Sequence, residues 1–315
     1  MAYETLIYRK EGRRATITLN RPQELNAIRP PMPDELERAV AEANADAEVR
    51  VIVVNGAGRA FCAGFDFSEG LRHHAGWGMP SAAERWDPGG DMLTTTSPFA
   101  SPIQKLASLW RSPKPVIAQV HGWCVGGGSD LALCADIVVA AEDARFGTPY
   151  SRVWGCYLTG MWIYRLGLTH AKLLALTGDM IDGAEAARIG LINVAVPTEK
   201  LEAEVAYWAE RLAKIPVSQL AAMKLVVNQA YDNMGLRTTQ LVGTILDGYM
   251  RHTPEALSFV ALAAERGIPA AVAERDRPFG DYSQAPPASG RDGNRRAPRN
   301  AVRPVTRSRR RAKRR

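Results

Sequence analysis

Two glycine-rich turns, each lying between an apolar run and a helical pattern, constrain the fold of this 315-residue chain most strongly. The first is NGAGRAFCAGFDFSE at 55–69, and the second is HGWCVGGGSDLALCAD at 121–136. Glycine lets backbone amides approach a ligand closely, and the helix that follows adds the positive end of its dipole. Two such turns side by side would direct two N–H groups at one oxygen, which is the arrangement of an oxyanion hole. Neither turn matches the glycine patterns of dinucleotide or phosphate loops, so nucleotide binding is not expected.

Short apolar runs alternate with helical patterns through the first half of the chain. Residues 15–20 (ATITLN) alternate apolar and polar side chains, which predicts a strand with one exposed face. A helix is predicted at 34–45, where Pro33 suits the first turn and apolar residues fall on one face. Further strands are predicted at 50–58, 115–122 and 135–141, and a further helix at 102–111. This alternation predicts an α/β domain with helices packed on a sheet.

The second half is helical almost throughout. After Gly160 only 192–197 (INVAVP) is expected to be extended, and several of the helical patterns end in glycine. We therefore divide the chain into an α/β core at 1–200, a helical oligomerisation region at 201–285 and a tail at 286–315. Within the core, 69–101 is rich in Gly, Pro, Ser and Thr and too long for a routine connection, which predicts a lid or a substrate-facing insertion.

The net charge of +7 belongs to the tail rather than to the core. Residues 288–315 hold twelve Lys or Arg and one Asp, a net of +11, so 1–287 carry a net of −4. Pro, Gly and Arg dominate the tail, which is expected to be disordered. Nucleic acid is expected as a partner only through this tail, and the tail lacks aromatic side chains for stacking on bases.

The remaining composition indicates an ordinary globular protein. Apolar runs are far shorter than the roughly 18–20 residues of a bilayer span, and the first residues lack the apolar core of a signal peptide. We expect a cytoplasmic protein with no membrane partner. The four cysteines, at 62, 124, 134 and 156, have neither metal-ligand nor disulfide spacing. Reduced thiols, no metal site and no cofactor are therefore expected.

Four segments together carry a resemblance to a known family. They are ITLNRPQELNAI at 17–28, GAGRAFCAGFDFSE at 56–69, HGWCVGGGSDLALCADIVVAAEDARFGTP at 121–149 and LTGDMIDGAEAARIGLINVAVP at 176–197. On these segments the chain resembles the crotonase, or enoyl-CoA hydratase/isomerase, superfamily over roughly residues 5–265. The resemblance implies a spiral of ββα units followed by helices that form trimers, often paired into hexamers. It also implies a coenzyme A thioester as substrate, so that coenzyme A is part of the substrate and not a cofactor.

The resemblance assigns the oxyanion hole and the substrate contacts to the glycine turns. Its two oxyanion-hole amides correspond to Phe65 and to Gly127, the middle glycine of GGG. From the residues alone, a structural role is the favoured interpretation: the glycines at 126–128 allow close packing of a helix on a strand, and Phe65 belongs to the core. The residues implied to contact the substrate are Leu25, Ala27, Ala63, Gly64, Asp66, Phe67, Ser68 and Gly126.

The acid–base positions depart from the hydratase pattern. Family hydratases place one Glu after the GGG and another after the FGxP turn, and the two carboxylates share the water that is added. Here the first position is Asp130, an acid that also resembles the dienoyl-CoA isomerase branch, and the second is Tyr150. A tyrosine hydroxyl has an ordinary pKa of about 10, so it donates a hydrogen bond but is a poor base. The further acid of the dienoyl isomerases corresponds to Leu158, which leaves that mechanism incomplete as well.

Residues after Tyr150 are expected to line the acyl side of the pocket. They are Arg152, Cys156 and Tyr157, in the segment PYSRVWGCYLTG. The alternative is that Cys156 packs in the core and that Arg152 is a solvated or interface charge.

The sequence thus predicts an acyl-CoA enzyme of the enoyl-CoA hydratase/isomerase type that stabilises a thioester enolate. Phe65 and Gly127 are the expected oxyanion hole, and Asp130 and Tyr150 are the expected catalytic side chains. Two alternatives stay open. One is a non-hydratase member, a double-bond isomerase or a C–C hydrolase, in which Asp130 is the single acid. The other is a non-catalytic protein that binds acyl-CoA or RNA.

Overall fold

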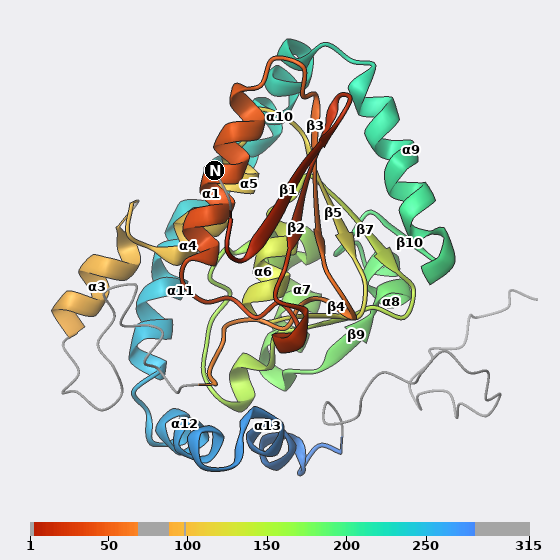
Figure 1. Ribbon diagram of the computed structural model, residues 1–315. Coiled ribbons are helices and arrows are strands. Elements are labelled where there is room, and N and C mark those ends of the chain that lie inside the picture. The colour runs from red at the N-terminus through yellow and green to blue at the C-terminus, as the bar shows by residue number, and fades with distance from the viewer. Residues whose placement is uncertain (1–2, 69–87, 98, 281–315) are drawn as a thin grey trace, which may run out of the picture. The chain divides into compact units, whose positions relative to one another are not determined.

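A six-stranded sheet forms the centre of the molecule in the computed structural model, which describes residues 3–68, 88–97 and 99–280 (Figure 1). Its strand order is β1-β2-β3-β5-β7-β10; β1 and β2 are antiparallel and the remaining pairs are parallel. The tail predicted at 286–315 lies outside the described residues. The strands are β1 (Leu6–Glu11), β2 (Arg14–Leu19), β3 (Val51–Gly56), β5 (Val116–Val120), β7 (Ile137–Ala141) and β10 (Val194–Val196).

Apart from β1, which the sequence analysis did not predict, the strands of this sheet lie where they were predicted. In β2, Ala15, Ile17 and Leu19 are fully buried while the residues between them are partly exposed, which confirms the predicted alternation. In β3 and β5, apolar residues are buried on both faces, as is usual for parallel strands covered by helices.

A second sheet, which the sequence did not predict, holds the glycine turns. It has the order β4-β6-β8-β9, with β4, β6 and β8 parallel and β9 antiparallel to β8. Each of its strands has three residues, too few to show a period of two. They are β4 (Ala60–Cys62), β6 (Trp123–Val125), β8 (Arg145–Gly147) and β9 (Met180–Asp182).

Helices of the first half cover the main sheet and connect the two sheets. The helix predicted at 34–45 is α1 (Met32–Ala45), and the helix predicted at 102–111 is divided at Ala107 into α4 (Pro102–Leu106) and α5 (Ser108–Arg111). Part of the predicted insertion is regular, because α3 (Pro88–Thr96) is a helix packed against α11; residues 69–87 and 98 lie outside the described part. Helix α6 (Gly127–Leu133) follows the second glycine turn directly.

The helical second half is confirmed, since α7 begins at Met161, but the expectation that only 192–197 is extended there was wrong, because β9 is also a strand. Helix α9 packs against β3, β5 and β7, and α12 and α13 lie at the foot of the view in Figure 1. The cysteines are free thiols, with Cys62, Cys124 and Cys134 buried. The helices are α7 (Met161–Thr177), α8 (Gly183–Arg188), α9 (Leu201–Ala213), α10 (Val217–Asn233), α11 (Leu236–Met250), α12 (Pro254–Arg266) and α13 (Ile268–Asp276), with 3₁₀ turns η1 (Pro22–Glu24), η2 (Pro149–Arg152) and η3 (Thr198–Lys200).

No helix in the described ranges combines the length and the apolar character needed to cross a membrane.

Candidate active site

The two glycine turns lie against each other. Strands β4 and β6 pair in parallel, with Cys62 opposite Cys124, so the turns that leave them start side by side. A Cβ at Gly64 would lie 2.9 Å from the Val125 carbonyl oxygen, and a Cβ at Gly128 would lie 2.2 Å from the Cys62 carbonyl oxygen. At Gly64 and at Gly128 the atom in the way is a backbone carbonyl oxygen, which cannot turn aside as a side chain could, so only glycine fits at these two positions.

Phe65 and Gly127 are adjacent at this contact. Phe65 bridges Ile28 in parallel: the Ile28 amide donates to the Gly64 carbonyl at 2.7 Å and the Asp66 amide donates to the Ile28 carbonyl at 2.9 Å. In such a pairing the Phe65 amide points to the opposite edge of the strand. Gly127 begins α6, where the first N–H groups have no acceptor within the helix. The Phe65 ring covers Gly127, because a Cβ there would lie 2.6 Å from the Phe65 Cε2.

Asp130 lies in α6, one turn after Gly127, and is fully buried. The Thr159 hydroxyl donates to its Oδ1 at 2.7 Å and the Thr159 amide to the same atom at 3.2 Å. Burial raises the pKa of Asp130 to about 6, although the hydrogen bonds from Thr159 and Tyr150 oppose the rise. The carboxyl group therefore titrates close to neutral pH, as a group that both accepts and returns protons must. Thr159 was missed by the sequence analysis, since nothing in its local pattern separates it from any other loop threonine.

Tyr150 lies in η2 and meets Asp130 directly. Its hydroxyl donates to the Asp130 Oδ2 at 2.7 Å. The ring lies against Gly155, where a Cβ would come within 2.3 Å of the Tyr150 Cδ1, and the hydroxyl would lie 3.9 Å from a Cβ at Gly126. Burial and the negative charge of Asp130 raise the pKa of Tyr150 well above its ordinary value, so the hydroxyl keeps its proton.

A cavity of about 480 Å³ lies next to this pair. Tyr150, Cys156 and Tyr157 line one wall, and residues of α7 and α11, among them Ile163, Val242, Gly243 and Met250, line the rest. Asp130, Phe65 and Gly127 are not among the residues that line the cavity, whereas Tyr150, whose hydroxyl donates to Asp130, is. Cys156 and Tyr157, which were expected on the acyl side of a substrate pocket, line this cavity.

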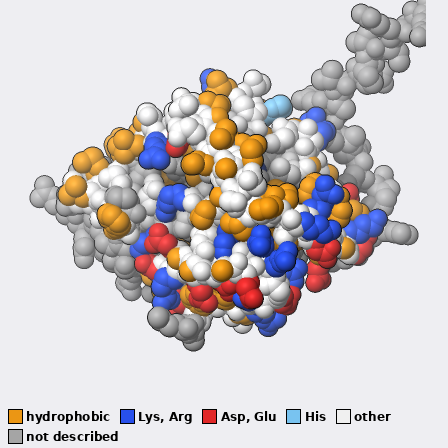
Figure 2. All heavy atoms as spheres, turned by 90° about the horizontal axis from the view of Figure 1, so that it is seen from above, with side chains coloured by type: hydrophobic (Ala, Val, Ile, Leu, Met, Phe, Trp, Pro, Cys, Tyr) orange, Lys and Arg blue, Asp and Glu red, His pale blue; other side chains and the backbone are white. Residues whose placement is uncertain are grey.

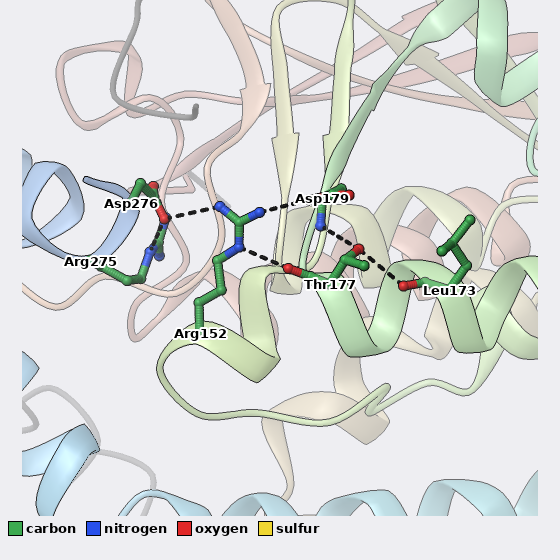
Figure 3. A network of polar contacts seen from close by, with 6 residues as sticks. All are labelled: Arg152, Leu173, Thr177, Asp179, Arg275 and Asp276. Carbon is green, nitrogen blue, oxygen red and sulfur yellow. Dashed lines mark hydrogen bonds and ion pairs between the residues drawn. The ribbon is translucent and has the colours of Figure 1, made fainter. Parts of the chain in front are cut away.

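Arg152 does not line this cavity, and the alternative expectation of a solvated charge was wrong. Its side chain neither lines the cavity nor is solvated, because it is 1% exposed and held by Asp179 and Asp276 (Figure 3). Asp179 and Asp276, the two acids that pair with it, are 27 and 124 residues away in sequence, so no local pattern reveals the pairing.

The residues implied to contact substrate lie together around the first turn, with several side chains already engaged. The Asp66 carboxylate pairs with Arg21 at 2.9 Å and accepts from the Ser68 amide at 2.9 Å. Burial acts to raise the pKa of Asp66, and these hydrogen bonds outweigh it and hold the pKa below its ordinary value. The Phe67 ring packs edge-on against Trp154, with the ring centroids 4.9 Å apart. The Asp66 carboxylate is therefore engaged within the protein, and the partly buried Phe67 ring packs against Trp154.

The other implied contacts form the floor of the same turn. Leu25 has a left-handed backbone (φ +52°), its carbonyl accepts from the Ala63 amide at 3.0 Å, and Ala27 is buried. Among the described residues, no group of three or more His, Cys, Asp or Glu side chains is placed to hold a metal ion.

The fold and the paired glycine turns define a class of α/β proteins that present two backbone amides beside a buried acid. Comparison with known protein families and solved structures identifies the same class. The enoyl-CoA hydratase/isomerase family model matches residues 10–254. The chain belongs to this family, which confirms the sequence-based resemblance.

Relatives of this family cover most of the chain. A crystal structure of an enoyl-CoA hydratase from Mycobacterium smegmatis superposes with a TM-score of 0.82 at 42% identity, covering 91% of this chain and 98% of that one. The "Crotonyl-CoA hydratase" of Syntrophomonas wolfei is 34% identical over 76% of this chain and 85% of its own length. A "Probable enoyl-CoA hydratase" of Rhodobacter capsulatus is 35% identical over 74% and 84%. The crotonase fold predicted from the sequence is thereby confirmed, and the protein is an enzyme of the hydratase/isomerase family.

Proposed function

We propose that this enzyme moves a proton on an acyl-CoA thioester, at the carbon next to the thioester carbonyl, and so shifts a double bond. One observation carries the proposal: Tyr150 lines the cavity while its hydroxyl donates to Asp130, which is buried behind it. The reactive unit is therefore the pair rather than Asp130 alone.

The step balances within the residues of the site. The C–H bond breaks, and its electrons form an enolate whose oxygen accepts hydrogen bonds from the Phe65 and Gly127 amides. The proton passes to the Tyr150 hydroxyl oxygen while the hydroxyl's own proton passes to the Asp130 Oδ2. Reversal at the γ-carbon returns the proton and completes the isomerisation. One oxyanion-hole donor contributes about 100- to 1,000-fold in rate, which is why the contact of the two turns matters.

Proton transfer fits the site better than hydration does. In the family's hydratase pattern two carboxylates share the added water, whereas position 150 of this chain carries a tyrosine whose pKa is raised well above its ordinary value. A single carboxyl group with a pKa of about 6 serves both the removal and the return of a proton near neutral pH.

We propose further that the coenzyme A arm follows the backbone at 65–68 and that the chain acts as a homotrimer or a hexamer of paired trimers. No residue of α10 is buried, yet Met223, Leu225, Val226 and Val227 of this helix are each more than half exposed. Hydrophobic side chains are also gathered over much of the face shown in Figure 2. An exposed apolar surface of this kind is typical of a subunit interface.

Turnover of 2-enoyl-, 3-enoyl- and dienoyl-CoA by the purified protein in deuterated water tests the proposal by mass spectrometry. We expect double-bond migration with deuterium incorporation, and we expect Asp130→Asn to abolish both. A hydrated product as the main product, or unchanged turnover in Asp130→Asn, would contradict it.

A further inference from the structure

Arg152, the last residue of η2, is held from three directions (Figure 3). Its Nε donates to the Thr177 carbonyl at 2.9 Å, and its Nη2 pairs with the Asp179 Oδ1 at 2.7 Å, both at the end of α7. Its Nη1 lies 3.5 Å from the Asp276 Oδ1 at the end of α13, and the Phe279 ring stacks 3.8 Å from its Cζ. The guanidinium thus joins η2 to two helices that are remote in sequence.

Asp276 supplies a buried negative charge between the arginines of this junction. It is fully buried between two arginines, Arg152 and Arg275, and the latter binds it in bidentate fashion at 2.6 and 2.8 Å. Without the carboxylate, the buried Arg152 and Arg275 guanidinium groups would lose the counter-charge that they share. Removing one partner of a buried ion pair is strongly destabilising for the charge that remains, so Arg152 would move away.

Movement of Arg152 would change the position of Tyr150 relative to Asp130, because Tyr150 and Arg152 lie in the same short turn, η2 (Pro149–Arg152). Tyr150 is fixed at one end of this turn by its hydrogen bond to Asp130, and Arg152 is fixed at the other end. The Val153 amide donates to the Tyr150 carbonyl at 3.3 Å, which ties the two ends together. Because the turn has only four residues, we expect a displacement of Arg152 to shift its backbone and with it Tyr150.

We propose that Asp276 is a positioning residue: through Arg152 it holds η2 so that the Tyr150 hydroxyl stays on Asp130. The proposal rests on the proposed function in that the Tyr150–Asp130 pair is the reactive unit. It gives α13, the last helix of the described residues, a part in the chemistry although Asp276 does not touch the site.

The expected signature is electrostatic. Loss of the Tyr150 hydrogen bond leaves only the two Thr159 hydrogen bonds to oppose burial and the negative charge of Asp247, so the pKa of Asp130 should rise by about one unit. The titratable groups that act with it in this region are Tyr150, Asp247, Cys124, Cys134, Cys156 and Tyr157.

The test compares Asp276→Asn with Asp179→Asn, which removes the other, half-exposed acid from the same guanidinium. The Asp130 carboxyl carbon is followed by ¹³C NMR as a function of pH, assigned with Asp130→Asn, and the pH profile of turnover is recorded alongside. We expect a pKa about one unit higher and a matching shift of the kcat profile in Asp276→Asn, with little change in Asp179→Asn. An unchanged Asp130 pKa in Asp276→Asn, even with a lower melting temperature, would reduce Asp276 to a structural residue and overturn the proposal, as would an equal shift in both variants.

Phe279→Ala decides the matter if Asp276→Asn does not fold. The Phe279 ring is 55% exposed, so its loss is tolerable, and it covers the same guanidinium. A smaller rise of the Asp130 pKa supports the proposal, and no rise contradicts it. Because the NMR titration needs no turnover, failure of this inference is distinguishable from failure of the proposed reaction.

Discussion

The Tyr150 hydroxyl donates a hydrogen bond of 2.7 Å to the Asp130 carboxylate across two elements that are 20 residues apart in sequence. This contact joins η2, which borders the cavity, to α6, which begins at the second glycine turn. It places a proton donor on the cavity wall and its acceptor in the protein interior.

Tyr150→Phe should impair turnover nearly as much as Asp130→Asn, because the proton passes through the hydroxyl. It should also raise the pKa of Asp130 further above its value of about 6, since a hydrogen bond to the ionised form is lost. Steady-state kinetics from pH 5 to 9 measure both effects. Tyr164→Phe, which removes a hydroxyl bonded to Thr239 at 2.9 Å, is the control and should keep the wild-type profile. Full activity of Tyr150→Phe would show that Asp130 acts on the substrate without a relay.

Asp130 should make the fold less stable as the pH rises. Its folded pKa is raised from 3.8 to about 6, so its ionised form is disfavoured in the folded state. The contribution of this group to stability is fully present below pH 4 and is lost progressively as the pH rises through 6, by about 3 kcal/mol in total. Urea unfolding at pH 5 and pH 8 should therefore show a smaller pH dependence in Asp130→Asn than in wild type. An identical dependence in both proteins would mean that the carboxylate is not disfavoured by its surroundings.

Gly64→Ala should damage the oxyanion hole. A Cβ there would lie 2.9 Å from the Val125 carbonyl oxygen, in a backbone at φ +97°. Gly190→Ala is a matched control with φ +84° and no atom within 4 Å of the added Cβ, and it should cost only the backbone strain, about 1–2 kcal/mol. Gly64→Ala should cost about 1–3 kcal/mol more and lower kcat about 100-fold. Denaturation and kinetics on the two variants separate strain from loss of the oxyanion hole, and equal activities would argue against the assignment.

Cys156→Phe should narrow the range of acyl chains that the enzyme accepts. Cys156 lines the cavity, where its Sγ lies 3.8 Å from the Met250 Sδ, so a larger side chain occupies that space. We expect kcat/KM for long acyl chains to fall at least about 10-fold relative to short ones, which is what a few methylene groups are worth in an apolar pocket. Cys156→Ser keeps the volume and should preserve the chain-length profile. A proportional loss for all chain lengths would place the acyl group elsewhere.

Val226→Glu should disrupt the oligomer. Val226 is 67% exposed on α10, and a charge there would have to be buried in any interface that covers this helix. Light scattering after size exclusion should show a smaller species for Val226→Glu, while Gln229→Glu, an exposed polar position of the same helix, should match wild type. A monomeric wild-type protein would contradict the proposed trimer.

Local sequence predicted the elements that obey a local period. The alternation at 15–20 marked β2 because a half-buried strand repeats every two residues, and the apolar face at 34–45 marked α1 for the corresponding helical reason. The three-residue strands β4, β6 and β8 carry no such period, and they exist because neighbouring segments of the chain supply their hydrogen bonds.

The sequence by itself determined the family, the glycine turns and the identity of Asp130 and Tyr150 as the residues at the two acid–base positions. Only the tertiary structure decided that Tyr150 borders the cavity and Asp130 does not, and that Arg152 is a buried ion rather than a pocket or surface charge. The reason is physical. Arg152 is buried because the fold brings Asp276 of α13 and Asp179 at the end of α7 next to it. The sequence around Arg152 does not indicate either contact.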